Sequence, residues 1–412
     1  MASRARYTRT MKEFEAAFAS EMREIDPAEW DALAGPYGNP LLSSSFLRLL
    51  EESGSIVPER GWSPAHLTLR REGRLIAAAP FYLRGDSWGD FVFDFEVAQA
   101  AESINAPYYP KLVGMIPATP APAWRIMIAR GEDEARISAL CLDIAAETAE
   151  ASGLGALQFN WVDPEFAPRF GARGRLLEWS HQSYLWSDSI EGEAGFESSA
   201  GGYGNFESYL RAFSKNMRRN VRREREGLAA AGVTSRIIRS AEAASHPKLL
   251  SRMADFYEST NDKFGPYAAR FLERDFFLRL PEFMDEGWLL SAGYERDAPI
   301  DDPIGLAFLF EGKNRLFGRY WGAARFVPGL HYELCYYRPI EYALERGIHA
   351  FDPGMGSEHK ARRGFRSVLA PSFHLAFDKR IQNLLAGYIP LASREASRAA
   401  RALDEELPFK RG

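Results

Sequence analysis

The stretch 352–366, DPGMGSEHKARRGFR, contains the residue types that acyl transfer requires. An imidazole or a carboxylate can accept a proton, and a nearby cation can stabilise negative charge on a carbonyl oxygen. Glycine permits left-handed backbone and close backbone approach, and Pro353 ends the preceding apolar segment. We interpret the stretch as a functional loop; a surface turn whose charges bond only one another is the alternative. Its candidate residues are Gly354, Gly356, Glu358, His359 and Lys360.

A second candidate is the cationic segment 215–226, which holds one lysine and five arginines against two glutamates. Several of the cations recur at spacings of three and four residues, which places them on one face of a predicted helix. Such a stripe suits the phosphates of a nucleotide tail, a pyrophosphate or an RNA backbone. A solvated helix face is the alternative. The predicted donor-phosphate ligands are Lys215, Arg218, Arg219 and Arg222.

A predicted cleft completes the set of candidates. Arg319 lies among strand aromatics, so it must either form an ion pair, with Glu333 or Asp352, or meet an anionic ligand. His331 and Glu333 fall in the first turn of a predicted helix, where free N–H groups favour an anion. A structural histidine is the alternative for His331. The cleft is assigned to Arg319, Tyr320, Trp321, His331, Glu333, Asp352, Gly354 and Gly356.

Other signatures are missing from the sequence. It has no Walker loop, no G-x-S-x-G elbow, no Rossmann glycine pattern and no paired Cys or His spacing for zinc. We therefore predict no metal and no tightly bound cofactor. Two cysteines in apolar stretches indicate a reducing compartment, and with no signal peptide we expect a cytoplasmic protein. No run of about 18 apolar residues predicts a membrane span.

The order of predicted elements indicates two similar halves in a chain of 412 residues with net charge -5. Each half reads as helix, hairpin, helix, strand and late strand, which predicts an α/β (α+β) fold with mixed sheets. We expect a partly helical arm over 1–25, a loop region over 86–123, a connector over 189–204 and one long helix from 205 to 232. The predicted domains are 26–188 and 205–390, followed by a C-terminal helix over 391–412.

Several of these motifs together resemble the bacterial FemAB-like family of peptidoglycan biosynthesis or recognition proteins in the GNAT superfamily. The resemblance covers about residues 40–380 and is carried by FSKNMRRNVRRERE, GRYWGA, LHYELCYYRPIEYALERG and FDPGMGSEHKARRGF. It implies two tandem GNAT-like domains with mixed central sheets flanked by helices, related to the Fem-type aminoacyltransferases. The Fem-type proteins share a motif in the helix before the second domain's first strand, and it is matched here by Arg219, Asn220, Val221 and Arg222. Their strand-to-loop motif is matched by Asp352, Gly354, Lys360, Gly364 and Phe365. At the position before the lysine, where the Fem-type proteins usually have an aromatic residue, this chain has His359.

The resemblance implies transfer of an acyl or aminoacyl group from an activated donor to an amine. Lys360 would stabilise the oxyanion, and His359 or Glu358 would accept the proton. The acyl-CoA signature of GNAT proteins is missing, which favours aminoacyl-tRNA or another activated donor over acyl-CoA. The acceptor would be a cell-wall precursor or an amino-acid-like molecule, and tRNA is a candidate partner. The alternatives are a non-catalytic binding module for a peptidoglycan precursor and an RNA-binding protein. The sequence does not determine the oligomeric state.

Overall fold

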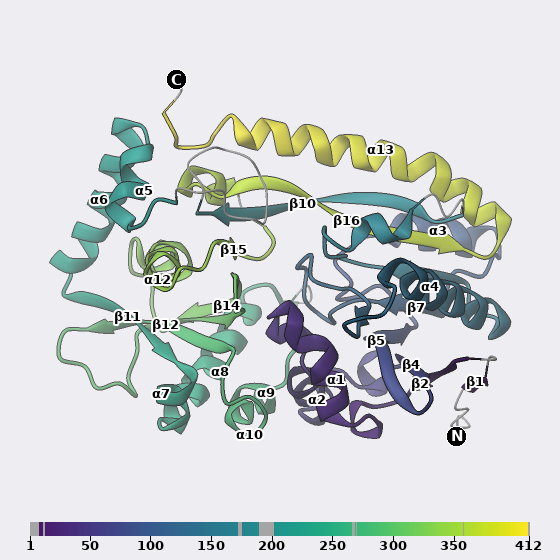
Figure 1. The fold of residues 1–412 in the computed structure, drawn as a ribbon. Helices are drawn as coiled ribbons and strands as arrows, with labels where there is room; N and C mark the ends of the chain where they lie inside the picture. Colours follow the sequence, from purple (N-terminus) through teal and green to yellow (C-terminus); the bar gives the residue numbers. More distant parts are fainter. Residues whose placement is uncertain are drawn as a thin grey trace. The chain divides into compact units, whose positions relative to one another are not determined.

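The chain forms two compact units, seen in a computed structural model (Figure 1). The structure describes residues 8–10, 13–171, 175–188, 202–265, 268, 270–356 and 358–410. Unit 1 comprises 1–181 and 369–398, and unit 2 comprises 182–368 and 399–412. This division differs from the predicted domains, because residues 369–390 belong to unit 1. The reason is that the end of β16 pairs with β9 of that unit. Most of the predicted connector 189–204 lies outside the described residues.

Unit 1 contains two groups of paired strands. The first group is antiparallel and runs in the order β1 (Thr8–Thr10), β2 (Glu15–Ala19), β4 (His66–Arg71), β5 (Arg74–Ala79) and β8 (Met127–Ile128). The second group has the order β16 (Arg366–Ala376), β9 (Ala156–Phe159), β7 (Lys111–Gly114), β6 (Phe81–Arg84) and β3 (Trp62–Pro64). It is mixed, because β7 and β9 are parallel while their other neighbours are antiparallel.

The helices and strands of unit 1 correct three predictions. They are α1 (Pro27–Ala34), α2 (Ser44–Glu52), α3 (Phe95–Ser103), α4 (Glu134–Ala151) and α13 (Lys379–Asp404), the last of which ends in unit 2. The arm predicted to be partly helical over 1–25 contains a strand in its described part, because β2 pairs with β4, and its helical portion there is a short 3₁₀ turn (Met22–Glu24). The predicted loop region 86–123 is also wrong in part, since it contains α3 and β7. The C-terminal helix begins at Lys379 rather than at 391.

A buried ionic network explains why the segment 86–123 is ordered. The Lys111 ammonium lies 3.0 Å from a carboxylate oxygen of Asp90 and 3.1 Å from one of Asp94, and Arg84 lies 3.1 Å from Asp90. All four side chains are fully buried. Buried charges must be paired, so these ion pairs join the strands β6 and β7 to the segment that leads into α3.

Unit 2 is built on one mixed sheet. Its strand order is β11 (Val233–Arg239), β12 (Trp288–Glu295), β13 (Gly305–Glu311), β14 (Arg315–Ala323), β15 (Ala350–Asp352) and β10 (Leu177–Ser187, which begins in unit 1). Only the β14–β15 pair is parallel among these described strands. The register of β13 and β14 shifts between Phe308, opposite Tyr320, and Leu309, opposite Gly318. Arg319 is therefore the extra residue of a β-bulge.

The helices of unit 2 cover both faces of this sheet, with α8 and α12 on opposite sides (Figure 1). A Cβ on Gly322 would meet the backbone of Phe256 in α8, whereas a Cβ on Gly293 would meet Leu330 on the other face. The helices are α5 (Phe206–Ala212), α6 (Lys215–Ala230), α7 (Ser240–Ala244), α8 (Pro247–Asp262), α9 (Arg274–Leu278), α10 (Leu280–Phe283), α11 (Leu330–Tyr332), a π-helical turn (Glu333–Tyr337) and α12 (Arg338–Arg346).

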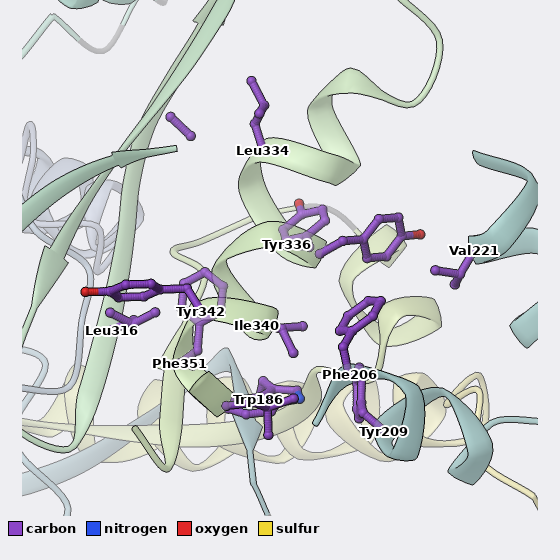
Figure 2. Packing of buried hydrophobic residues seen from close by; sticks show 14 of the residues in the cluster. Trp186, Phe206, Tyr209, Val221, Leu316, Leu334, Tyr336, Ile340, Tyr342 and Phe351 are labelled. Atoms are coloured by element: carbon purple, nitrogen blue, oxygen red, sulfur yellow. The ribbon is translucent and has the colours of Figure 1, made fainter. Parts of the chain in front are cut away.

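The single long helix predicted over 205–232 is wrong, because the chain breaks between α5 and α6. Phe213 has an extended backbone with a fully buried side chain, and the Ser214 hydroxyl then accepts a hydrogen bond from the Met217 N–H to cap α6. The break lets Phe213 join a buried hydrophobic cluster. Figure 2 shows Phe206 and Tyr209 of this cluster. Within the described ranges, no helix is both long enough and apolar enough to span a lipid bilayer.

Candidate active site

Unit 2 contains a cavity of about 260 Å³ where the bulged strand pair meets the 330–337 helix and the 353–360 loop. This volume is small beside the range of roughly 300–1,000 Å³ typical of sites for drug-sized ligands, and it suits a molecule of amino-acid size. Its wall combines aromatic and other apolar residues with a few cationic and polar groups. The lining residues are Ala307, Phe308, Leu309, Gly318, Arg319, Tyr320, Trp321, His331, Cys335, Tyr336, Pro353, Met355, Gly356 and Lys360.

The glycine-rich loop reaches the cavity because two of its glycines adopt left-handed backbone. Gly354 and Gly356 have φ values of 78° and 82°. The Gly354 N–H donates to Asp352 Oδ1 at 2.8 Å, which fixes the turn after β15. A Cβ on Gly354 would also lie 3.1 Å from the Gly318 carbonyl oxygen. The loop can therefore pack against the bulge only with glycine at this position.

Lys360 is the cation that this loop presents to the cavity. It lies in a short 3₁₀ helix (Glu358–Arg363), and only 3% of its surface is exposed. Its ammonium donates to the carbonyls of Gly354 at 2.7 Å and Met355 at 2.8 Å. An ammonium has three N–H groups, so one donor remains for a ligand. Burial lowers the pKa of Lys360 to about 8, with Asp352 opposing this effect and Arg319 adding to it.

Arg319 is fixed by the bulge and is only partly paired. Its Nη1 donates to the Gly318 carbonyl at 2.8 Å and lies 3.5 Å from Asp352 Oδ1. The ion pair with Asp352 that the sequence suggested is present, whereas Glu333 lies elsewhere. Only 3% of the side chain is exposed, yet Nε and Nη2 have no hydrogen-bond partner among the described residues. A buried guanidinium edge without partners is a costly arrangement that a bound anion would relieve.

His331 supplies a neutral imidazole to the same cavity. Its ring lies 4.6 Å from the Trp321 ring and 5.3 Å from the Tyr336 ring. Burial lowers the pKa of His331 to about 4, and the neighbouring positive charge of Lys360 and Arg363 adds to this effect. The imidazole is therefore unprotonated at neutral pH and can accept a proton. Burial likewise raises the pKa of Tyr320, so this phenol remains protonated.

Three other residues predicted from sequence lie away from the cavity wall. Glu358 and His359 are exposed and do not line the cavity, although the His359 ring lies 6.2 Å from the Tyr332 ring. Glu333 is buried in a separate cluster, where Arg225 donates two hydrogen bonds of 2.9 Å and Ser235 donates one of 2.7 Å. The loop therefore brings Lys360 to the cavity but leaves its two sequence neighbours outside.

The cationic helix α6 does not line the cavity either. Lys215 and Arg219 are exposed, Arg218 donates a long hydrogen bond of 3.5 Å to the Arg211 carbonyl, and Arg222 forms an ion pair of 2.7 Å with Glu207. These four residues remain a predicted phosphate site.

The cationic helix is nevertheless joined to the loop that carries Lys360. Arg363, three residues after Lys360, lies 3.1 Å from a carboxylate oxygen of Glu224 on α6. Arg363 also stacks 3.4 Å from the centre of the Tyr332 ring and donates to the His359 carbonyl at 3.1 Å. These contacts fix the helix and the 3₁₀ segment as one structure.

Several cavity residues were missed by sequence reasoning. Cys335 follows His331 by four residues, so helical spacing could have placed both on the same face. Tyr336 comes one residue later and reaches the wall because the helix widens into a π-turn there. Such a turn has no sequence signature. Phe308 and Met355 carried no signal beyond being apolar.

Residues 21–411 match the FemAB-like family, described as peptidoglycan biosynthesis/recognition. This match covers most of the chain, so the protein belongs to the FemAB-like family. No curated protein sequence matches the chain.

Solved structures show the same fold at low sequence identity. The C-terminal domain of a protein described as a lysylphosphatidylglycerol synthetase from Agrobacterium fabrum has a TM-score of 0.53 and 11% identity, covering 89% of this chain and 95% of its own. A conserved protein of unknown function from Bacteroides thetaiotaomicron has a TM-score of 0.50 and 10% identity, covering 87% and 98%. FemX is less similar, with a TM-score of 0.49 and 13% identity, covering 88% and 98%, and the shared fold rests on the first two structures. The predicted α/β (α+β) fold with mixed sheets flanked by helices is confirmed.

Proposed function

We propose that unit 2 transfers an acyl or aminoacyl group from an activated donor to an amine. The donor would be an aminoacyl-tRNA or an acyl thioester, and the acceptor a peptidoglycan precursor or an amino-acid-like molecule. Membership of the FemAB-like family supports the substrate class. The observation that carries the proposal is that Lys360 and the neutral His331 line one small cavity.

The proposed reaction needs no covalent enzyme intermediate. The amine nitrogen attacks the acyl carbon, a C–N bond forms, and the carbonyl electron pair moves onto oxygen. The free N–H of Lys360 donates to this oxyanion in a site of low polarity, where such a bond is strong. As the C–N bond forms, the nitrogen becomes acidic, and His331 accepts its proton. The oxyanion pair then re-forms the carbonyl as the C–O or C–S bond of the donor breaks, and His331 gives its proton to the leaving alkoxide or thiolate.

In this proposal the exposed cations of α6 hold the phosphates of the donor. Lys215 and Arg219 have no ion-pair partner among the described residues and are the strongest candidates. Arg218, which is half-buried and donates to the Arg211 carbonyl, and Arg222, which is paired with Glu207, would contribute less. With an RNA donor, the Lys215→Ala/Arg219→Ala variant should bind more weakly and show a shallower dependence of affinity on salt.

The test is transfer of radiolabel from aminoacyl-tRNAs and from acyl-CoAs to peptidoglycan precursor peptides and free amino acids. Lys360→Met should lower kcat by about 10²–10³-fold, the typical effect of removing one oxyanion donor. Lys248→Met, an exposed change on α8, is the matched control. If no donor is consumed while the precursor still binds, the protein is a binding module and the proposal is wrong.

A pair of histidine variants tests which group accepts the proton. His331→Asn should reduce the rate, because His331 lines the cavity, and His359→Asn should reduce it less. If His359→Asn reduces the rate more than His331→Asn does, His359 accepts the proton, as the sequence suggested.

A further inference from the structure

We infer that the cavity recognises the carboxylate of an amino-acid-sized acceptor through the Nε–Nη2 edge of Arg319. This inference rests on the proposed function and names the class of acceptor. A carboxylate has two oxygens that match two parallel N–H groups of a guanidinium, which makes the planar arginine fork selective for it.

The bulge in β14 leaves this particular edge of the fork unoccupied. Nη1 is used by the Gly318 carbonyl and by Asp352, whereas Nε and Nη2 lie together on the other edge. Both atoms are buried and neither has a hydrogen-bond partner among the described residues. Arg319 also lines the cavity, and we place the carboxylate of the ligand against this unpaired edge.

The charge balance around the cavity favours a single negative charge on the ligand. Arg319 and Lys360 contribute two positive charges and Asp352 contributes one negative charge, which leaves one net positive charge. A carboxylate would neutralise it. A phosphate dianion would leave an excess negative charge in a buried site, which is unfavourable.

The rest of the wall fits the body of an amino acid. Trp321 and Tyr336, whose rings both lie against the His331 ring, give the cavity aromatic sides, and its volume is about 260 Å³. In an aminoacyl ester the α-carboxyl group is itself esterified, so it cannot present a free carboxylate. A free α-carboxylate would therefore belong to the acceptor, which would be held with its amine close to His331 and Lys360.

The first experiment needs no variant of the protein. Isothermal titration calorimetry would compare free amino acids with their carboxamides, with inorganic phosphate as a third probe. The acid should bind at least about tenfold more tightly than its amide, since the amide would leave the buried guanidinium edge poorly matched. Equal affinity for acid and amide, tighter binding of phosphate, or no binding of any amino acid would overturn the inference.

Variants of Arg319 then test the geometry. Arg319→Lys keeps the charge but removes the fork, so it should abolish most of the preference for acid over amide. Circular dichroism and thermal unfolding would verify that the variant folds. If Arg319→Lys folds and retains the full preference, the fork is not the recognition element.

The two proposals can fail separately. Equally fast transfer of label to acceptors with and without a carboxylate would refute this inference and leave the proposed transferase function intact. Carboxylate binding that depends on Arg319, with no transfer from any donor, would support this inference and refute the transferase function.

Discussion

Burial of Lys360 should make the stability of the protein depend on alkaline pH in a way that can be calculated. Its pKa is lowered to about 8 in the folded state because the ammonium is desolvated, whereas a lysine in an unfolded chain has a pKa of roughly 10.4. Between these values the unfolded chain binds the proton and the folded protein does not. The free energy of unfolding therefore rises with pH across this window.

The size of the effect follows from the two pKa values. Each unit of difference is worth about 1.36 kcal/mol, so the protonated lysine lowers stability by about 3 kcal/mol at pH 7. Most of this penalty disappears by pH 10, because that pH is close to the pKa of the lysine in the unfolded chain. We expect a gain of about 2.5 kcal/mol between pH 7 and pH 10 from this residue.

Lys360→Met removes this pH-dependent contribution. At pH 7 the variant avoids the desolvation cost but leaves the carbonyls of Gly354 and Met355 without their partner, which costs about 1–3 kcal/mol each. The wild type and Lys360→Met should thus have similar stability at pH 7. At pH 10 the wild type should be the more stable by about 2 kcal/mol or more.

Urea unfolding at pH 7, 8, 9 and 10, followed by circular dichroism, would measure the difference between wild type and Lys360→Met. Lys248→Met, a change at an exposed position on α8, serves as control. Its free energy of unfolding should differ from that of the wild type by the same amount at every pH. A wild-type advantage that stays constant or shrinks with increasing pH would refute the burial argument for Lys360.

Two further predictions concern stability. His181 and His374 are buried in unit 1 and burial lowers the pKa of each to about 3, so they remain neutral in the folded state while the unfolded chain protonates near pH 6.5. Stability is complete above pH 6.5 and should fall by about 4 kcal/mol as pH drops from 7 to 5, a loss that urea unfolding would detect and that the His181→Asn/His374→Asn variant should lack. Gly322→Ala would place a Cβ 2.7 Å from the carbonyl carbon of Phe256, so we expect destabilisation of about 1–3 kcal/mol in denaturant, whereas Gly227→Ala in the open interior of α6 should stabilise by about 0.5–1 kcal/mol. If both glycine variants behave alike, packing of α8 on the sheet is not the reason for Gly322.

Local sequence signals were sufficient for most of the regular elements. Ser43 accepts a hydrogen bond from the Phe46 N–H at the start of α2, as its position before an amphipathic segment predicts. The hairpin of β4 and β5 turns at Glu72 and Gly73, which both have positive φ, between two apolar runs. Such signals depend on residues only a few positions apart and can therefore be recognised in the sequence.

Elements held by distant partners could not be predicted in this way. The mixture of polar and apolar residues in β2 predicts part of a partly helical arm. The segment is a strand because it pairs with β4. The segment 86–123 contains turn-forming residues, and it is ordered by the ion pairs of Asp90 and Asp94 with Lys111. These pairings depend on contacts that span tens of residues, about which local propensity says nothing.

The candidate site divides in the same way. The sequence by itself determined the residue types, the glycine-rich loop after β15 and the presence of a buried arginine beside Tyr320 and Trp321. Only the tertiary structure decided which of three adjacent loop residues faces the cavity. In a 3₁₀ helix successive side chains point about 120° apart, so Lys360 turns inward while Glu358 and His359 face solvent. The bulge that holds Arg319 likewise arises from the register of β14 against β13, which no single strand sequence specifies.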